Sequence, residues 1–158
     1  MQADELAARE SLRDLTSRYN MHGDSGRIAE LVALFTEDGE LEVDGDAVCR
    51  GHTALHAFFA GVAQGGASVP ELRTLRHHLT TQQIDMLDAG RATARTYFTV
   101  YTDRGVDHWG VYRDDFRLTA QGWRIARRRV GVDGFTPGGW GEAAMAANTA
   151  GALRDQKS

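Results

Sequence analysis

Two adjacent histidines, His77 and His78, are the residues of this sequence best suited to acid–base chemistry. They open a strand-like segment that ends near Ile84. Side chains alternate in direction along a strand, so one histidine faces a pocket while its neighbour faces away. In an unbroken strand His77 shares its face with Leu79 and Gln83. Because an imidazole titrates near neutral pH, the pair predicts a pocket in which one histidine removes a proton.

Such a base works best with a carboxylate partner. A carboxylate hydrogen-bonded to one ring nitrogen fixes the tautomer, leaves the other nitrogen free to accept a proton, and stabilises the imidazolium that forms. It has to come from another part of the chain, and a bend between two helices that cover the sheet is a suitable source. Asp24 lies at such a bend. An aspartate before a helix is also commonly an N-cap, with Ser25 as a competing cap, so both interpretations stay open at this point.

Three helices are predicted in the first half of the chain. The first covers residues 4–21 and ends near Gly23, the second follows Ser25 and extends through Phe35, and the third follows Gly51. A short hairpin between the second and third helices turns at Asp44-Gly45. Apolar residues recur at helical spacing in all three helices: Leu12, Leu15 and Tyr19; Ile28, Leu31 and Val32; Leu55, Phe58 and Phe59.

From Leu75 onward the hydrophobic pattern changes from helical to alternating. Four long strands are predicted, at residues 75–87, 92–102, 108–118 and 123–130, with turns short enough to make neighbouring strands antiparallel. Asp107 and His108 begin the third strand and could reach a pocket rim, although a surface turn explains them more simply. Helices followed by a meander predict an α+β domain: a curved, mostly antiparallel sheet of four to six strands that packs on three N-terminal helices around a conical pocket.

The chain of 158 residues has the length of one domain, which we place at residues 1–131. Residues 132–158 form a different kind of segment, with Phe135 and Trp140 beside Pro137 and several glycines, followed by an alanine-rich stretch. Exposed aromatic side chains are unfavourable in water. We therefore expect this tail to cover the pocket mouth or a subunit interface.

Composition argues against several classes of partner and location. The formal net charge is −4 and the isoelectric point is near 5.8, which gives no general attraction to nucleic acid or to anionic membranes. No apolar run approaches the length of a membrane span, and the acidic N-terminus lacks the apolar core of a signal peptide. We expect a soluble, cytoplasmic protein that binds neither nucleic acid nor membrane.

The sequence also offers few residues for a cofactor or a metal. Cys49 is the only cysteine, so neither a disulfide nor a thiolate cage forms within the chain. His52 and His56 have a spacing that allows metal binding, but the glutamates of a zincin motif are missing. A phosphate-binding glycine loop and a nucleophile elbow are also absent from the sequence. We expect chemistry without a cofactor and without a metal.

Five features that follow one another along the chain together resemble a known family. They are Tyr19 with Asp24 five residues later, the segment LVALFTEDGEL, the helix after Gly51, the strand His77-His78-Leu79-Thr80, and the closing Gly122-Trp123-Arg124-Ile125. Over residues 6–130 the sequence resembles the SnoaL-like branch of the nuclear-transport-factor-2 (NTF2) fold superfamily. It is most similar to the group of scytalone dehydratase, hexachlorocyclohexane dehydrochlorinase and bile-acid dehydratase, which use an Asp–His pair in a mostly apolar cone without a metal.

The resemblance implies that Asp24 is the acid and His77 the base, with Tyr19 and Arg128 as further catalytic residues. Arg128 has the opposite strand parity to Ile125, so it faces the pocket only if a bulge intervenes or Ile125 packs on the other side. A register shift of one residue would exchange His77 for its neighbour. Substrate contacts are expected from four more residues: Tyr112, Phe98, His78 and Phe135.

The function we favour is a cofactor-independent β-elimination of the dehydratase type on a small, hydrophobic, cyclic substrate. His77, oriented by Asp24, would remove a proton beside an electron-withdrawing group, while Tyr19 or Arg128 stabilises an enolate or helps a hydroxide or halide to leave. A polyketide or terpenoid cyclase or isomerase would begin with the same deprotonation. A ligand-binding or assembly module is the third alternative, and it predicts a separated Asp24 and His77 and a cavity filled by side chains. A homo-oligomer, either a dimer or a trimer, is expected.

Overall fold

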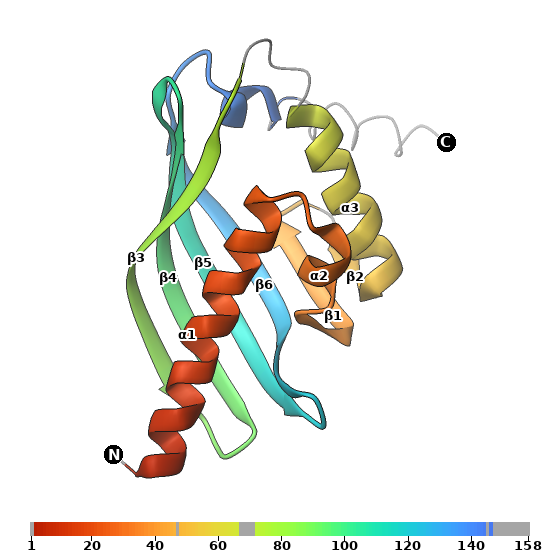
Figure 1. The fold of residues 1–158 in the computed structure, drawn as a ribbon, viewed down its shortest axis with the longest axis vertical. Helices are drawn as coiled ribbons and strands as arrows, with labels where there is room; N and C mark the ends of the chain where they lie inside the picture. The colour runs from red at the N-terminus through yellow and green to blue at the C-terminus, as the bar shows by residue number, and fades with distance from the viewer. Residues whose placement is uncertain (1, 47, 67–71, 145, 147–158) are drawn as a thin grey trace.

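A six-stranded curved sheet forms the frame of the molecule (Figure 1). The computed structural model describes residues 2–46, 48–66, 72–144 and 146. The strands are β1 (Phe35–Val43), β2 (Cys49–Arg50), β3 (Leu75–Met86), β4 (Arg91–Thr102), β5 (Gly105–Thr119) and β6 (Gly122–Phe135). They stand in the order β2-β1-β6-β5-β4-β3, and all neighbours are antiparallel except β1 and β6, which are parallel.

The helices lie on one face of this sheet (Figure 1). α1 (Ala3–Asp24) crosses the face and packs against β3, whereas α2 (Ile28–Val32) and α3 (Gly51–Gly66) pack beside it, α3 against β1. The predicted α+β class, with a curved, mostly antiparallel sheet packed on three N-terminal helices, is therefore confirmed. The helix predicted after Gly51 and the hairpin turn at Asp44-Gly45 are also present, and both turn residues have positive φ, as a type I′ turn requires.

The first two helices differ from the prediction at their ends. α1 continues through Asp24, so this aspartate ends one helix and does not cap the next. α2 has only 5 residues, and Phe35 begins a strand. The cause is tertiary pairing: Phe35 lies opposite Ile125 of β6, whose backbone N–H donates to the carbonyl of Leu34 at 2.9 Å. Pairing with β6 outweighs the helical spacing of the apolar residues.

Two β-bulges decide which side chains face the helices. In β6 the register against β5 shifts between Asp115 and Phe116, so Ala126 is an extra residue and Arg128 turns to the same face as Ile125. Of the two conditions under which Arg128 was expected to face the pocket, the intervening bulge is the one that is met. A second bulge, between Leu79 and Gln82 of β3, was not predicted.

The β3 bulge corrects the face assigned to Gln83. From Leu79 to Gln82 β3 advances three residues, whereas β4 advances only two, from Phe98 to Thr96, so Gln82 takes the inward position. The amide nitrogen of Gln82, Nε2, donates to the hydroxyls of Thr16 on α1 and Thr96 on β4, at 3.2 and 3.0 Å. Gln83 faces outward and is exposed.

The last strand is longer than predicted. β6 continues past Val130 to Phe135, and its final residues pair with the start of β5. Residues 140–144 then form a short helical turn at the end of the molecule where α3 also ends (Figure 1). The alanine-rich stretch of the predicted tail lies largely outside the described residues.

The hydrophobic core fills the space between the helices and the sheet. Its members are buried leucines and aromatic residues from every layer: Leu12 and Leu15 of α1, Leu31 of α2, Leu55 and Phe59 of α3, and Phe35, Leu41, Phe98, Phe116 and Ile125 of the sheet. Within the part of the chain that the structure describes, no helix is long and apolar enough to cross a membrane.

Replacing Leu55 with alanine tests the position of the core. Leu55 is completely buried, so Leu55→Ala should lower the free energy of unfolding by about 2–5 kcal/mol. Leu6→Ala is the matched control, because Leu6 is 58% exposed and should change stability by no more than about 0.5 kcal/mol. Urea unfolding followed by circular dichroism measures both, and equal losses would contradict this packing.

Candidate functional site

Asp24 and His77 form a close pair at the point where the end of α1 meets the start of β3. Oδ1 of Asp24 lies 2.7 Å from Nδ1 of the His77 ring, and Oδ2 accepts the backbone N–H of His77 at 2.9 Å. Both carboxylate oxygens therefore hold one residue. The Asp24 side chain is 8% exposed and the His77 side chain 22% exposed. With Nδ1–H directed at the carboxylate, Nε2 of His77 is left to accept a proton.

A polar stripe on α1 places Asp24 against the sheet. Thr16, Asn20 and Asp24 are four residues apart and therefore lie on one face of the helix. Each meets a polar side chain of the sheet: Thr16 accepts from Gln82, Asn20 accepts from the Tyr112 hydroxyl at 3.1 Å, and Asp24 binds His77. The stripe fixes both the rotation of α1 and its position along the sheet.

Arg128 is completely buried behind this stripe. Its guanidinium forms two hydrogen bonds with the carboxylate of Asp114, both at 2.7 Å. It lies between two aromatic rings, with Cζ 3.9 Å from the Tyr19 centroid and 4.2 Å from the Tyr112 centroid. Burial opposes the charge, but Asp114 outweighs it and the pKa of Arg128 lies above its usual value. Among the described residues Nη1 of Arg128 has no hydrogen-bond partner.

The two tyrosines are neutral phenols at neutral pH. Burial raises the pKa of Tyr19 and raises that of Tyr112 well above its usual value, whereas the charge of Arg128 acts to lower both. The Tyr112 ring stacks on Phe98 at 4.6 Å, and Phe98 lies 6.2 Å from the His77 ring. Asp24 and Phe98 thus lie beside His77, and Tyr112, Tyr19 and Arg128 follow Phe98 in a series of ring contacts.

Two residues named from sequence lie elsewhere. His78 is on the outer face of the sheet, exposed, with its ring 4.8 Å from that of Tyr101. This placement corrects the expectation that His78 contacts a substrate held at His77, and strand alternation is the reason. Phe135 ends β6 opposite His108 and is 38% exposed.

A second histidine–aspartate pair, for which a surface turn was the favoured interpretation, faces the first. β5 starts at Gly105, three residues earlier than predicted, and a register shift against β4 leaves Asp107 as an extra residue, so Asp107 and His108 are both buried. Nδ1 of His108 is 2.6 Å from Oδ2 of Asp107, and the His108 ring lies 6.3 Å from that of His77. Burial lowers the pKa of His108, although Asp107 acts to raise it. The adjacent Asp-His before an alternating strand was the available signal.

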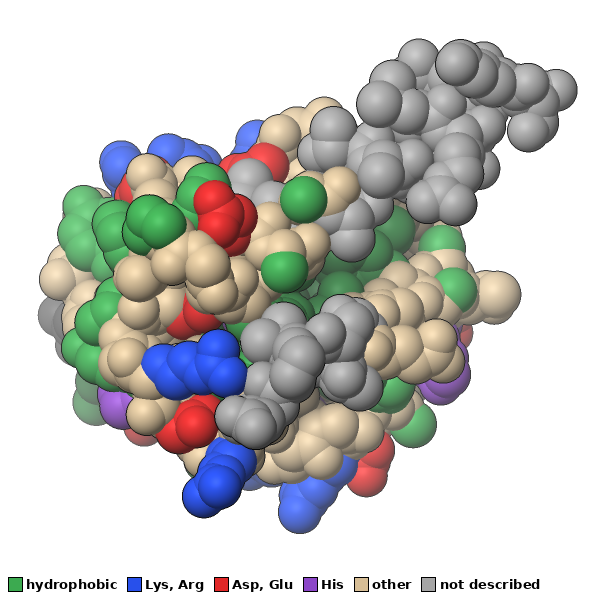
Figure 2. Space-filling view, turned by 90° about the horizontal axis from the view of Figure 1, so that it is seen from above, with side chains coloured by type: hydrophobic (Ala, Val, Ile, Leu, Met, Phe, Trp, Pro, Cys, Tyr) green, Lys and Arg blue, Asp and Glu red, His purple; other side chains and the backbone are tan. Residues whose placement is uncertain are grey.

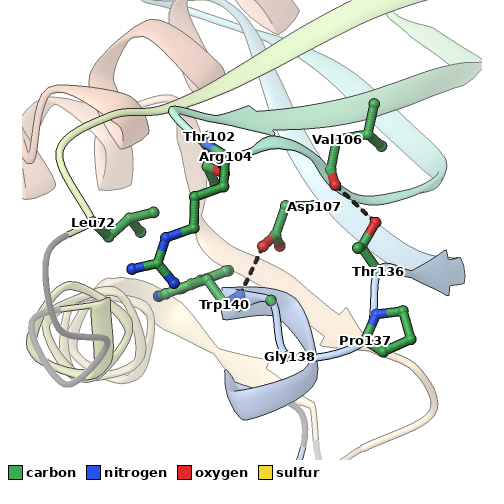
Figure 3. A pocket seen from close by; sticks show the side chains of 10 residues that line it. Leu72, Thr102, Arg104, Val106, Asp107, Thr136, Pro137, Gly138 and Trp140 are labelled. Atoms are coloured by element: carbon green, nitrogen blue, oxygen red, sulfur yellow. Dashed lines mark hydrogen bonds between the residues drawn. The ribbon is translucent and has the colours of Figure 1, made fainter.

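A small cavity of about 90 Å³ borders the second pair, where the β4–β5 turn meets residues 136–140. Figure 2 views the molecule from above, where hydrophobic side chains are recessed in a hollow. The lining of the small cavity includes Asp107, Thr102, Arg104 and Trp140 (Figure 3). A wider groove of about 390 Å³ between Arg91, Arg117 and Arg127 is formed by other residues. Neither includes Asp24 or His77.

The arrangement is suited to moving protons. Across the described ranges no three His, Cys, Asp or Glu side chains come together in a way that could hold a metal ion. The site instead offers an imidazole with a fixed tautomer, a second imidazole facing it, and neutral phenols beside a buried cation. These are the groups that general acid–base catalysis uses.

The buried ion pair yields a prediction for stability. Asp114→Asn should lower the free energy of unfolding by about 3–5 kcal/mol, because it leaves the Arg128 charge buried without its partner. Asp115→Asn is the control: its contact with Arg129 is half exposed and should contribute no more than about 1 kcal/mol. Chemical unfolding of both variants measures the difference, and a similar small effect of both would contradict the buried pair.

The lowered pKa of His108 predicts a dependence of stability on pH. Because the folded protein binds this proton less readily than the unfolded chain, stability is complete above the unfolded value of about 6.5 and falls as the pH drops below it. His108→Gln should reduce the difference between the unfolding midpoints measured at neutral pH and near pH 5. An unchanged difference in the variant would show that His108 does not contribute.

The sequence and the fold were compared with those of known proteins. The SnoaL-like domain model matches residues 4–129. An NTF2-like protein with a cystatin-like fold from Novosphingobium aromaticivorans is 29% identical, with a TM-score of 0.71 over 85% of this chain and 87% of that chain. A provisionally assigned scytalone dehydratase from the same species is 22% identical, with a TM-score of 0.74 over 86% and 91%.

The hexachlorocyclohexane dehydrochlorinase LinA-type3 from Novosphingobium barchaimii shares the fold at 19% identity, with a TM-score of 0.70 over 85% of this chain and 92% of that one. No curated protein matches the sequence. The resemblance inferred from sequence motifs is thereby confirmed, together with the NTF2-like, cystatin-like fold. The chain belongs to the SnoaL-like domain family.

Proposed function

We propose that this protein is a cofactor-independent lyase that catalyses a dehydratase-type β-elimination. The observation that carries the proposal is that both carboxylate oxygens of Asp24 bind His77, Oδ1 at 2.7 Å from the ring Nδ1 and Oδ2 at 2.9 Å from the backbone N. With both oxygens engaged, Asp24 orients the imidazole and stabilises its protonated form, and it is not itself the base. The base is Nε2 of His77, on the side of the ring away from the carboxylate.

The proposed reaction starts beside a carbonyl of a small cyclic hydroxy ketone. Nε2 of His77 takes the proton from the carbon next to the carbonyl, and the electrons of that C–H bond form an enolate. The enolate then forms a C=C bond as the β-hydroxyl departs, and the proton held on His77 leaves with it as water. The imidazole returns to its starting state, so no cofactor is consumed.

Tyr19 and Arg128 are proposed to stabilise the enolate, since the Tyr112 hydroxyl already donates to Asn20. Arg128 lies against the Tyr19 ring face, so its charge strengthens that phenol as a hydrogen-bond donor. His108, with Nδ1–H directed at Asp107, presents Nε2 as an acceptor. It would hold the β-hydroxyl of the substrate near His77, whose ring is 6.3 Å away. Phe98 and Tyr112 supply the apolar wall, whereas Phe135 would act at the rim.

The alternatives make different predictions. A cyclase or isomerase would use the same deprotonation and give a product of unchanged mass. A non-catalytic module was expected to keep Asp24 and His77 apart and to fill the cavity with side chains. The 2.7 Å contact disfavours it, whereas the two described cavities, neither lined by Asp24 or His77, do not. The homo-oligomer and the cytoplasmic location stay predictions; three half-exposed aromatic residues on the outer face of the sheet are compatible with a subunit contact: Tyr97, Tyr101 and Trp109.

The test is loss of water from a panel of cyclic β-hydroxy ketones, followed by mass spectrometry. His77→Gln and Asp24→Asn should each lower the rate by about 10²–10⁴-fold, the usual contribution of a positioned base. His78→Gln is the matched control, because the neighbouring side chain lies on the outer face and should leave the rate unchanged. Equal loss in the His77 and His78 variants, or no dehydration of any ketone by the wild-type protein, would sink the proposal.

A further inference from the structure

One carboxylate, that of Asp107, joins the second imidazole to the C-terminal segment. Oδ1 accepts the backbone N–H of Trp140 at 2.7 Å, and Oδ2 lies 2.8 Å from the backbone N of Gly141 and 2.6 Å from Nδ1 of His108. The carbonyl of Asp107 accepts the N–H of Thr136 at 2.6 Å. Asp107 is 3% exposed. Since a carboxylate only accepts, the His108 nitrogen beside it must carry the proton.

The backbone of residues 139–141 fits closely against this pair. A Cβ at Gly139 would stand 2.6 Å from Oδ1 of Asp107, and one at Gly141 would stand 2.8 Å from Nδ1 of His108. Only glycine allows this approach at either position. Between them, Trp140 lays its indole over the His108 ring, with centroids 5.6 Å apart and the planes at 30°. The dashed line in Figure 3 joins the backbone N of Trp140 to the Asp107 carboxylate on the rim of the small cavity.

These contacts depend on one another. If residues 139–141 moved away, two donors would leave the Asp107 carboxylate, and water would reach both it and the imidazole. The carboxylate could then turn, and His108 would lose the acceptor that selects its Nδ1–H tautomer. The other ionisable groups near His108 are His77, 6.3 Å away on β3, and Arg104, which lines the same cavity from the β4–β5 turn. Neither replaces an acceptor at Nδ1.

We infer that Asp107 is a positioning residue that makes the tautomer and orientation of His108 depend on the docking of residues 139–141. When residues 139–141 dock at the cavity rim, they also fix the tautomer and the orientation of His108. The use of His108 in elimination rests on the proposed function. The coupling itself is measured on the protein without substrate, so each idea can fail without the other.

Long-range ¹H–¹⁵N spectra of the histidine rings report the tautomer of His108, and amide hydrogen exchange reports the docking of Trp140 and Gly141. In the wild-type protein at mildly alkaline pH, His108 should show a single Nδ1–H tautomer and both amides should be protected. Asp107→Asn should convert the ring to a mixture of tautomers and speed exchange of both amides by about tenfold or more. A single Nδ1–H tautomer in this variant would overturn the inference.

Gly139→Ala separates the coupling from the carboxylate, because it displaces the segment and leaves Asp107 unchanged. The same change of His108 tautomer is expected. Gly61→Ala in α3 is the matched control, since a Cβ there meets nothing within 4 Å, and both signals should stay as in the wild type. Loss of amide protection in Gly139→Ala with an unchanged His108 tautomer would show that the two are independent.

If either variant fails to fold, the wild-type protein still provides the test. The amide protons of Trp140 and Gly141 and the Nδ1 proton of His108 should open in one local event, with the same free energy of opening across temperature. A His108 ring proton that stays protected while the two amides exchange would contradict the coupling.

Discussion

The contact between Asp24 and His77 is the constraint on which the arrangement of the interior depends. It joins the last residue of α1 to the start of β3, and it uses a backbone donor as well as a ring nitrogen. A backbone N–H cannot rotate away, so the carboxylate is held in place whatever the protonation state of the ring. Because Asn20 and Thr16 continue the same helical face, one contact at the end of α1 sets the register of the whole helix against the sheet.

The second constraint is electrostatic. Arg128 has no exposed surface and depends on Asp114 to offset the cost of burying its charge. A pair of this kind adds little stability compared with apolar packing, and its presence under Tyr19 and Tyr112 needs another explanation. The faces of two neutral phenols against a guanidinium make the phenol hydrogens better donors. In the proposed elimination, the buried ion pair would serve to stabilise a developing negative charge on a substrate oxygen.

Much of the fold and part of the site were predictable from sequence, for identifiable reasons. The change from helical to alternating spacing at Leu75 was clear, and the motif around Asp24 and His77 led to a pair that the structure brings together. Residues whose placement depends on partners distant in sequence were harder. Phe35 lies in a strand because it pairs with β6. The β3 bulge turns Gln82 inward in place of Gln83, and no local sequence pattern predicts this bulge.

Asp107 shows the same limit at the site. Read alone, Asp107-His108 at the end of a turn is an ordinary surface pair, and what buries it is a segment about thirty residues later whose backbone amides fold onto the carboxylate. Neither partner has a sequence signature, since main-chain N–H groups are common to nearly all residues. Besides the adjacent Asp-His itself, the sequence signals this contact only through the glycines at 139 and 141, because a side chain there would collide with Asp107 or His108. The two imidazoles therefore differ in what holds their carboxylate partners: Asp24 is part of a core helix, whereas Asp107 is bound by the backbone of a segment at the cavity rim.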